Sequence, residues 1–166
     1  MTVHDARNDR FGRSFGEFAV GDVFRHWPGR TITAAEDHLF CMLTMAASPL
    51  HIDAHYAATE MEGARNIVVG TFIYAALLGM SVPDTSGKAI AALGTKDLRH
   101  VAPLYHGDSL YAESTVVAAR ASKSRPEAGV VTIETRGYNQ HGALVCEFQR
   151  TFLVPISDAR MTASGA

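Results

Sequence analysis

His51 is a candidate for acid–base chemistry, because an imidazole takes up and releases a proton near neutral pH. It lies in the stretch 48–53, Ser-Pro-Leu-His-Ile-Asp. Pro49 disfavours helical geometry in the residue before it, so we expect a preceding helix to end at or before Ser48. The sequence therefore predicts that His51 lies on a loop.

Gly70, Ser48 and Asp53 are the other candidates for a reactive site around this histidine. Gly70 should open a helix, where unpaired N–H groups and the helix dipole favour developing negative charge; a glycine there also permits close packing, and the sequence leaves both roles open. Ser48 can hydrogen-bond a water or a substrate oxygen, although serine before proline is also common in turns. Asp53 precedes a helical run, so helix capping is favoured over contact with substrate.

Three helices are expected to position these residues. Thr33 and Glu36 fit a capping box that starts the first helix, which should end before Pro49. The apolar face of this helix, at helical spacing, consists of Leu39, Phe40, Leu43 and Thr44. Asp53 should cap a short second helix that Gly63 interrupts. Residues 70–82 carry hardly a charge on any side, which indicates a central helix wrapped by other structure.

Strand-like runs follow the central helix. They are Ala89 to Leu98, Ser109 to Ala121, Val130 to Tyr138 and Ala143 to Val154. A short strand is also expected within residues 15–27, and residues 139–142, Asn-Gln-His-Gly, suit a hairpin turn. Four successive strands suggest an antiparallel meander. Strands that curl around one apolar helix describe an α+β architecture.

The length, composition and net charge of the chain limit the classes of function that it can have. The chain has 166 residues, 47% of them hydrophobic, and a net charge of -2, which suits one domain and gives no overall field toward nucleic acid or an anionic membrane. We expect flexible segments at 1–14 and 157–166 around a single domain at 15–156. No signal peptide or membrane span is apparent, so a cytoplasmic protein is expected. Cys41 and Cys146 should be reduced core residues, and no histidine spacing suits a metal site.

Three motifs resemble the MaoC-like branch of the hotdog superfamily, over about residues 15–154. They are the proline–histidine stretch 45–53, the pair Val69-Gly70, and the run 103–110, Pro-Leu-Tyr-His-Gly-Asp-Ser-Leu. R-specific enoyl-CoA hydratases of that branch carry Gly-Asp-x-Asn-Pro-x-His-x-Asp, a His-Gly pair and Pro-x-x-x-Gly-Asp-x-Leu at these places. Residues 49–57 and 106–113 are most similar to hydratases of small branched dicarboxylic CoA esters, such as mesaconyl-CoA, β-methylmalyl-CoA and itaconyl-CoA.

The resemblance implies a hotdog fold, a curved antiparallel sheet around a central helix, and a hydratase or dehydratase that uses no metal or redox cofactor. His51 stands at the position of the catalytic histidine of these hydratases, and Ala46 and Ser48 replace their aspartate and asparagine. A dicarboxylic substrate brings its own carboxylate, which a fixed aspartate would repel. We therefore hypothesise that Ala46 suits such a substrate, and that its carboxylate, or a water held by Ser48 and His51, replaces the absent base.

The CoA moiety of such a substrate would need cations for its phosphates. Arg99, Lys123 and Arg125, together with Lys96, are the candidates, although each taken singly suits a solvated surface charge. Asp53 is a further candidate for contact with the substrate.

Two other functions remain open from the sequence. Ala46 would also suit a non-catalytic acyl-CoA-binding subunit or a degenerate partner of an intact enzyme. A hotdog thioesterase ranks lower, because nothing singles out an acidic residue on the central helix. In each case we expect a homodimer, or a higher oligomer built from dimers, because an exposed sheet edge of such a subunit is usually paired.

Overall fold

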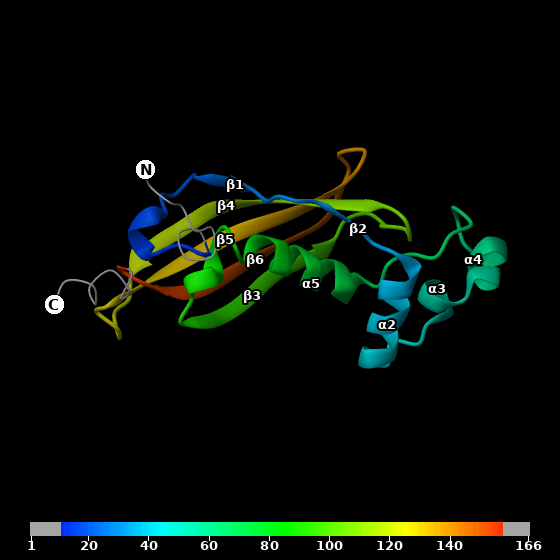
Figure 1. Ribbon diagram of the computed structural model, residues 1–166, viewed down its shortest axis with the longest axis horizontal. Helices are drawn as coiled ribbons and strands as arrows, with labels where there is room; N and C mark the ends of the chain where they lie inside the picture. The colour runs from blue at the N-terminus through cyan, green and yellow to red at the C-terminus, as the bar shows by residue number, and fades with distance from the viewer. Residues whose placement is uncertain (1–10, 158–166) are drawn as a thin grey trace, which may run out of the picture.

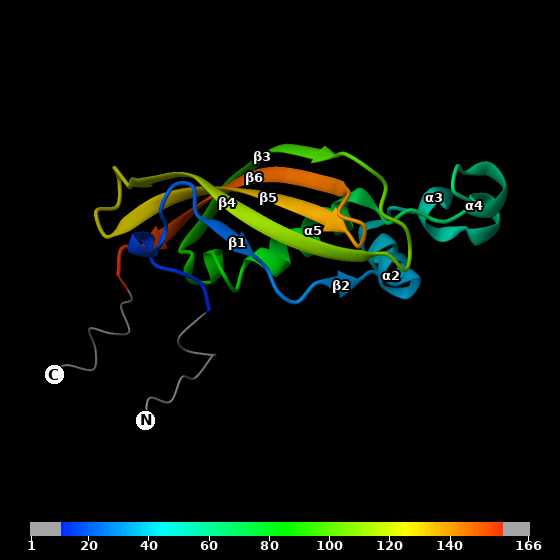
Figure 2. The same cartoon turned by 90° about the horizontal axis from the view of Figure 1, so that it is seen from above.

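The computed structural model describes residues 11–157. Its helices are α2 (Ala34–Thr44), α3 (Pro49–Ile52), α4 (Ala54–Glu60) and α5 (Gly70–Ser81), with 3₁₀ turns η1 (Phe15–Glu17) and η2 (Ser86–Lys88). Its strands are β1 (Val23–Arg25), β2 (Arg30–Thr31), β3 (Ala91–His100), β4 (Ser109–Ala121), β5 (Ala128–Asn139) and β6 (Leu144–Pro155). Helix α5 lies along one face of the sheet, whereas α2, α3 and α4 gather beyond one of its ends (Figures 1 and 2).

The strands form one antiparallel sheet in the order β1-β4-β5-β6-β3, with β2 paired to β4 beside β1. The predicted meander is therefore confirmed for β4, β5 and β6 and is wrong for β3, which pairs with β6 at the far edge. The reason is that residues 101–108 cross the end of the sheet before β4 begins (Figure 2). The hairpin turn at 139–142 is confirmed, with Gly142 at a φ of 76°.

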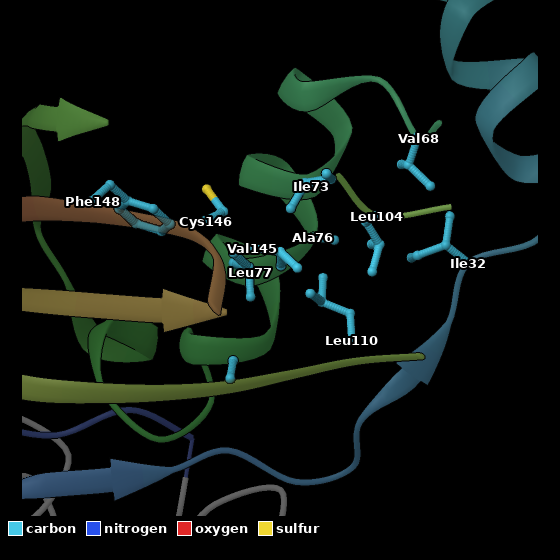
Figure 3. Packing of buried hydrophobic residues seen from close by; sticks show 11 residues of the cluster. Ile32, Val68, Ile73, Ala76, Leu77, Leu104, Leu110, Val145, Cys146 and Phe148 are labelled. Carbon is cyan, nitrogen blue, oxygen red and sulfur yellow. The ribbon is translucent and has the colours of Figure 1, made fainter. Parts of the chain in front are cut away.

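The main core lies between α5 and the sheet. Leu77 of α5 is fully buried and packs within a cluster that includes Leu104, Leu110 and Phe148 (Figure 3). Gly137 of β5 lets the helix approach closely, since a Cβ atom there would lie 2.5 Å from a methyl carbon of Leu77. The predicted α+β architecture, a curved antiparallel sheet around an apolar helix, is thus confirmed.

Helix α2 starts as predicted, with both hydrogen bonds of the capping box between Thr33 and Glu36. It turns Asp37 and Cys41 toward the rest of the chain, and both are buried. Most of the predicted apolar face points elsewhere as a result. Leu43, for example, is 76% exposed in the single chain.

His51 lies in the one-turn helix α3, so the prediction of a loop is wrong. Pro49 occupies the first position of that helix, where its fixed φ is favourable and its missing N–H costs nothing. Ser48 stays extended before it, as expected for a residue before proline. Asp53 caps α4 as predicted, because its carboxylate accepts the N–H of Tyr56 at 2.9 Å.

Most of the two segments expected to be flexible, residues 1–10 and 158–166, lies outside the described residues. Within residues 11–14, the N–H groups of Gly12 and Arg13 donate to the carbonyls of Pro83 and Thr85, which joins this part to the chain after α5. Across residues 11–157, the helices are all too short or too polar to cross a bilayer. Cys41 and Cys146 are buried free thiols, as predicted.

Candidate active site

A cavity of about 360 Å³ lies where the start of α5 meets the end of β3. It is lined by His51, Ile67, Val68, Gly70, Ile73 and residues 100–104. Apart from the two histidines at 51 and 100, these side chains are apolar. The structure therefore brings His51 and Gly70, two of the three predicted catalytic residues, to one largely apolar hollow.

The His51 ring is oriented by a backbone carbonyl. Its Nδ1 atom lies 2.8 Å from the oxygen of Ile67, which can only accept a hydrogen bond. Nδ1 therefore carries the proton in the neutral ring, and Nε2 has the free lone pair. A histidine held in this form can take a proton from a water molecule through Nε2.

Asn66 holds the turn that carries His51. Its amide nitrogen lies 3.2, 3.0 and 3.1 Å from the carbonyl oxygens of Pro49, Leu50 and Asp53, and the Asn66 side chain is buried. The N–H of Ile67 adds a bond to the carbonyl of Leu50. Sequence reasoning missed Asn66. The only signal was a lone amide placed directly before the apolar run 67–69.

Gly70 begins α5 at the wall of the cavity. The first N–H groups of a helix lack partners within the helix and carry its positive partial charge, so this end of α5 suits an oxygen that gains negative charge. The close-packing role is present as well. A Cβ atom on Gly70 would lie 2.7 Å from Nε2 of His100.

His100, which the sequence did not single out, is the last residue of β3. It is in register with Cys146, a member of the core cluster that faces α5. Neighbouring residues of a strand point to opposite faces, so His100 faces the cavity while Arg99 faces away. The alternation within β3 was the available signal, but a bulge between Lys96 and Arg99 obscures it.

A buried carboxylate supports the same region from behind. Asp37, fully buried, accepts the N–H of Val69 at 3.1 Å, and Val69 directly precedes Gly70. The other oxygen of Asp37 lies 2.8 Å from Nε2 of His106. His106 is thus engaged with Asp37, and His55 lies exposed on α4.

Ser48, the third predicted catalytic residue, has a backbone role. Its N–H donates to the carbonyl of Ala46, its own carbonyl accepts the N–H of His51 at 3.0 Å, and it precedes α3 as the N-terminal cap. The Ser48 side chain makes no capping bond and is not among the residues that line the cavity. Asp53 is used in capping α4.

The structure does not bring the predicted phosphate-binding cations to this cavity. Arg99 forms an ion pair with Glu147 and lines a separate hollow of about 510 Å³ that also holds Asp97 and Glu134, an unfavourable setting for phosphate. Lys123 and Arg125 lie in the loop between β4 and β5, at the end of the sheet opposite α3 (Figure 1). Lys96 lies 3.8 Å from a carboxylate oxygen of Asp97. Within residues 11–157, no cluster of three or more His, Cys, Asp or Glu side chains suits a metal ion.

Comparisons with known proteins agree with this architecture. The family model described as mesaconyl-CoA hydratase matches residues 2–166. The mesaconyl-CoA hydratase of Cereibacter sphaeroides is 33% identical over 153 residues, which cover 92% of this chain and 44% of that protein. The (R)-specific enoyl-CoA hydratase of Aeromonas caviae is 34% identical over 125 residues, 74% of this chain and 86% of that protein.

A solved structure described as a putative MaoC domain protein dehydratase from Chloroflexus aurantiacus superimposes with a TM-score of 0.79 at 31% identity, covering 91% of this chain and 42% of that chain. The chain spans less than half the length of the mesaconyl-CoA hydratases that it matches. The sheet wrapped around α5 is the hotdog fold, as the resemblance implied. Because the family model covers every residue that the structure describes, the chain belongs to the mesaconyl-CoA hydratase family of MaoC-like proteins.

Proposed function

We propose that this chain catalyses the reversible addition of water to the double bond of an enoyl-CoA, with a small branched dicarboxylic acyl-CoA such as mesaconyl-CoA as substrate. The observation that carries the proposal is the fixed orientation of His51. Its Nδ1 atom is held by the carbonyl of Ile67, which leaves Nε2 available at a cavity that also contains the start of α5.

His51 and α5 divide the chemistry between them. Nε2 of His51 takes a proton from water as the water oxygen bonds to the β-carbon, and the electrons of the double bond shift toward the thioester oxygen. The first N–H groups of α5 stabilise that oxygen. The proton on His51 then returns to the α-carbon on the same face of the double bond, so the reaction balances with one acid–base group.

The substrate class rests on the names of the matched relatives and on the lack of a carboxylate among the residues that line the cavity. The resemblance implies an acid at the position of Ala46, and the cavity lining is apolar apart from two imidazoles. A second carboxylate on the substrate would thus meet no fixed negative charge among the residues that line the cavity. The names of the relatives from Cereibacter sphaeroides and Chloroflexus aurantiacus, mesaconyl-CoA hydratase and β-methylmalyl-CoA dehydratase, agree with this class.

A homodimer is part of the proposal, with higher oligomers built from it. Every residue of the edge strand β3 is exposed in the single chain, including Leu93 at 54%. Helix α2 likewise exposes Met42 at 77% and Leu43 at 76%. An unpaired strand edge with apolar side chains favours pairing with a second subunit. Sedimentation equilibrium would measure the stoichiometry, and a monomer at micromolar concentration would contradict it.

Steady-state assays test the activity. Hydration of mesaconyl-CoA, followed by loss of the enoyl-thioester absorbance, is expected for the wild type, with loss of at least about 100-fold in kcat/KM for His51→Gln. His55→Gln is the matched control, because His55 is exposed four residues away on α4. Full activity of His51→Gln would contradict the catalytic role. Equal kcat/KM values for crotonyl-CoA and mesaconyl-CoA would contradict the dicarboxylic substrate.

A second candidate function rests on Ala46 alone: an acyl-CoA-binding partner subunit without turnover. It would bind mesaconyl-CoA without hydrating it and would copurify with a second hotdog chain that has both the aspartate and the histidine. Turnover by the isolated chain would exclude this alternative.

A further inference from the structure

We propose that His100 is a further catalytic residue, whose ring N–H donates a hydrogen bond to the thioester oxygen of the substrate beside the first N–H groups of α5. The inference rests on the proposed function and deepens it. A side chain of β3 would then share the charge stabilisation with the first N–H groups of α5.

The His100 ring lies directly against the start of α5. Three ring atoms of His100, Nε2, Cε1 and Cδ2, would lie 2.7, 2.8 and 3.1 Å from a Cβ atom built on Gly70. The imidazole therefore covers the site where any other residue at the start of α5 would place its side chain. Nε2 is the nearest of these atoms, so a nitrogen of the ring faces the helix terminus.

The cavity at the start of α5 contains few polar side chains. His51 and His100 both line it, and the other lining side chains are apolar. An oxygen bound at the start of α5 would thus have His100 as its polar side-chain neighbour on the β3 side. His100 is exposed in the single chain, and a substrate bound in this hollow would shield the ring from water. A hydrogen-bond donor shielded in this way contributes more than it does in water.

The chemistry of imidazole agrees with this task. A neutral ring donates one N–H and a protonated ring donates two, so His100 offers a donor in either form. Within residues 11–157, neither ring nitrogen of His100 takes part in a hydrogen bond. In contrast, His51, His106 and His26 each have a ring nitrogen hydrogen-bonded to a neighbouring group. The His100 N–H is free to meet a substrate.

A donor at the thioester oxygen stabilises the negative charge that develops there during the reaction. When water adds to the β-carbon, negative charge develops on the thioester oxygen and returns to the α-carbon as the proton arrives. A donor at that oxygen lowers the energy of the charged state more than that of the uncharged thioester. His100 would therefore raise kcat and leave KM little changed.

The variant His100→Phe separates donation from packing. Phenylalanine keeps an aromatic ring over Gly70 and removes both nitrogens, so a purely structural role would survive the change. We expect kcat for mesaconyl-CoA to fall about 100-fold, with partial rescue in His100→Asn, whose amide restores an N–H donor. His55→Phe, an exposed substitution on α4, is the control for a general effect of the added phenylalanine.

A binding measurement tests the same bond without turnover. Methylsuccinyl-CoA, the saturated analogue of mesaconyl-CoA, has no double bond to hydrate. With a ¹³C label in its thioester carbonyl, the C=O stretch in the infrared spectrum should move to lower frequency on binding to the wild type, and by a smaller amount on binding to His100→Phe.

The outcomes separate the two proposals. If the wild type binds the analogue but does not hydrate mesaconyl-CoA, the proposed function fails, and the infrared comparison decides the role of His100. If His100→Phe retains kcat within threefold of the wild type, or gives the same carbonyl frequency, the role of His100 is overturned. A wild type that does not bind the thioester overturns both.

Discussion

Nε2 of His106 lies 2.8 Å from one carboxylate oxygen of Asp37, and the other oxygen of the same carboxylate accepts the N–H of Val69. These residues come from the turn before β4, from α2 and from the end of the segment that leads into α5. A single buried carboxylate therefore joins three segments behind the candidate site. The position of Gly70 depends on this junction, because Val69 is its neighbour.

Replacement of Asp37 should destabilise the whole fold. Asp37→Ala leaves His106 and the N–H of Val69 without their buried acceptor, and we expect a loss of about 3 kcal/mol in the free energy of unfolding. Urea denaturation measures it. Asp53→Ala is the control, since this exposed capping carboxylate should contribute only about 1 kcal/mol. Equal losses in the two variants would refute the special role of the buried pair.

Asn66→Ala should lower activity more than its effect on stability suggests. The amide connects three carbonyls around His51, so its loss frees the turn that orients the ring. We expect a loss of about 1 to 2 kcal/mol in stability and at least about a tenfold loss in kcat/KM for mesaconyl-CoA.

Asn139→Ala is a matched control for Asn66. The Asn139 side chain accepts the N–H groups of His141 and Ala143 in the hairpin between β5 and β6, away from the cavity. It should change stability without changing kcat/KM. Equal kinetic effects of both substitutions would show that the loss is not specific to the His51 turn.

Local signals in the sequence predicted the elements well. The capping box of Thr33 and Glu36, the cap at Asp53, the apolar run of α5 and the glycine of the last hairpin depend on neighbours within a few residues, and all are confirmed. The place of β3 was predicted wrongly because adjacency in a sheet depends on where the connecting segment runs. Strand periodicity does not contain that information.

The candidate site was predicted only in part for the same reason. His51 and Gly70 follow from the resemblance of short motifs, and both line the cavity. The roles of Asp37, Asn66 and His100 depend on contacts with residues that lie 13 to 69 positions away in the sequence. Local sequence patterns do not predict such contacts. The cations were assigned from charge alone, and the ion pair of Arg99 with Glu147 arises from strand register.

The buried His26 should make stability depend on pH. Burial lowers the pKa of His26 from 6.5, against the opposing effect of its contact with Asp84. Below pH 6.5 the unfolded chain binds a proton that the folded chain resists, so stability is fully present above this pH and falls as the pH decreases.

Urea denaturation at pH 7.5 and pH 5.5 tests this prediction. The difference in unfolding free energy between the two conditions should be smaller in His26→Gln than in the wild type. His141→Gln, at an exposed hairpin position, should leave the difference unchanged. A pH dependence that His26→Gln does not reduce would rule out His26 as its source.

Both cysteines should be unreactive in the folded protein. Burial raises the pKa of the Cys146 thiol to about 11 and raises that of Cys41 as well, so little thiolate exists at pH 8. We expect Ellman's reagent to label both thiols on unfolding in guanidinium chloride and neither beforehand. Fast labelling of the native protein would show that one of these core positions opens readily.

Two glycines of α5 should respond in opposite ways to alanine. Gly79 has open space around its Cβ position, so Gly79→Ala should stabilise the protein by up to about 1 kcal/mol through helix propensity and leave kcat unchanged.

In Gly70→Ala the new methyl group would overlap the His100 ring. The exposed ring can move aside, so the expected cost in stability is small. The displaced imidazole can no longer meet an oxygen at the helix terminus, and kcat for mesaconyl-CoA should fall by at least tenfold. If Gly70→Ala and Gly79→Ala hydrate mesaconyl-CoA equally fast, the close approach of His100 to the start of α5 has no part in catalysis.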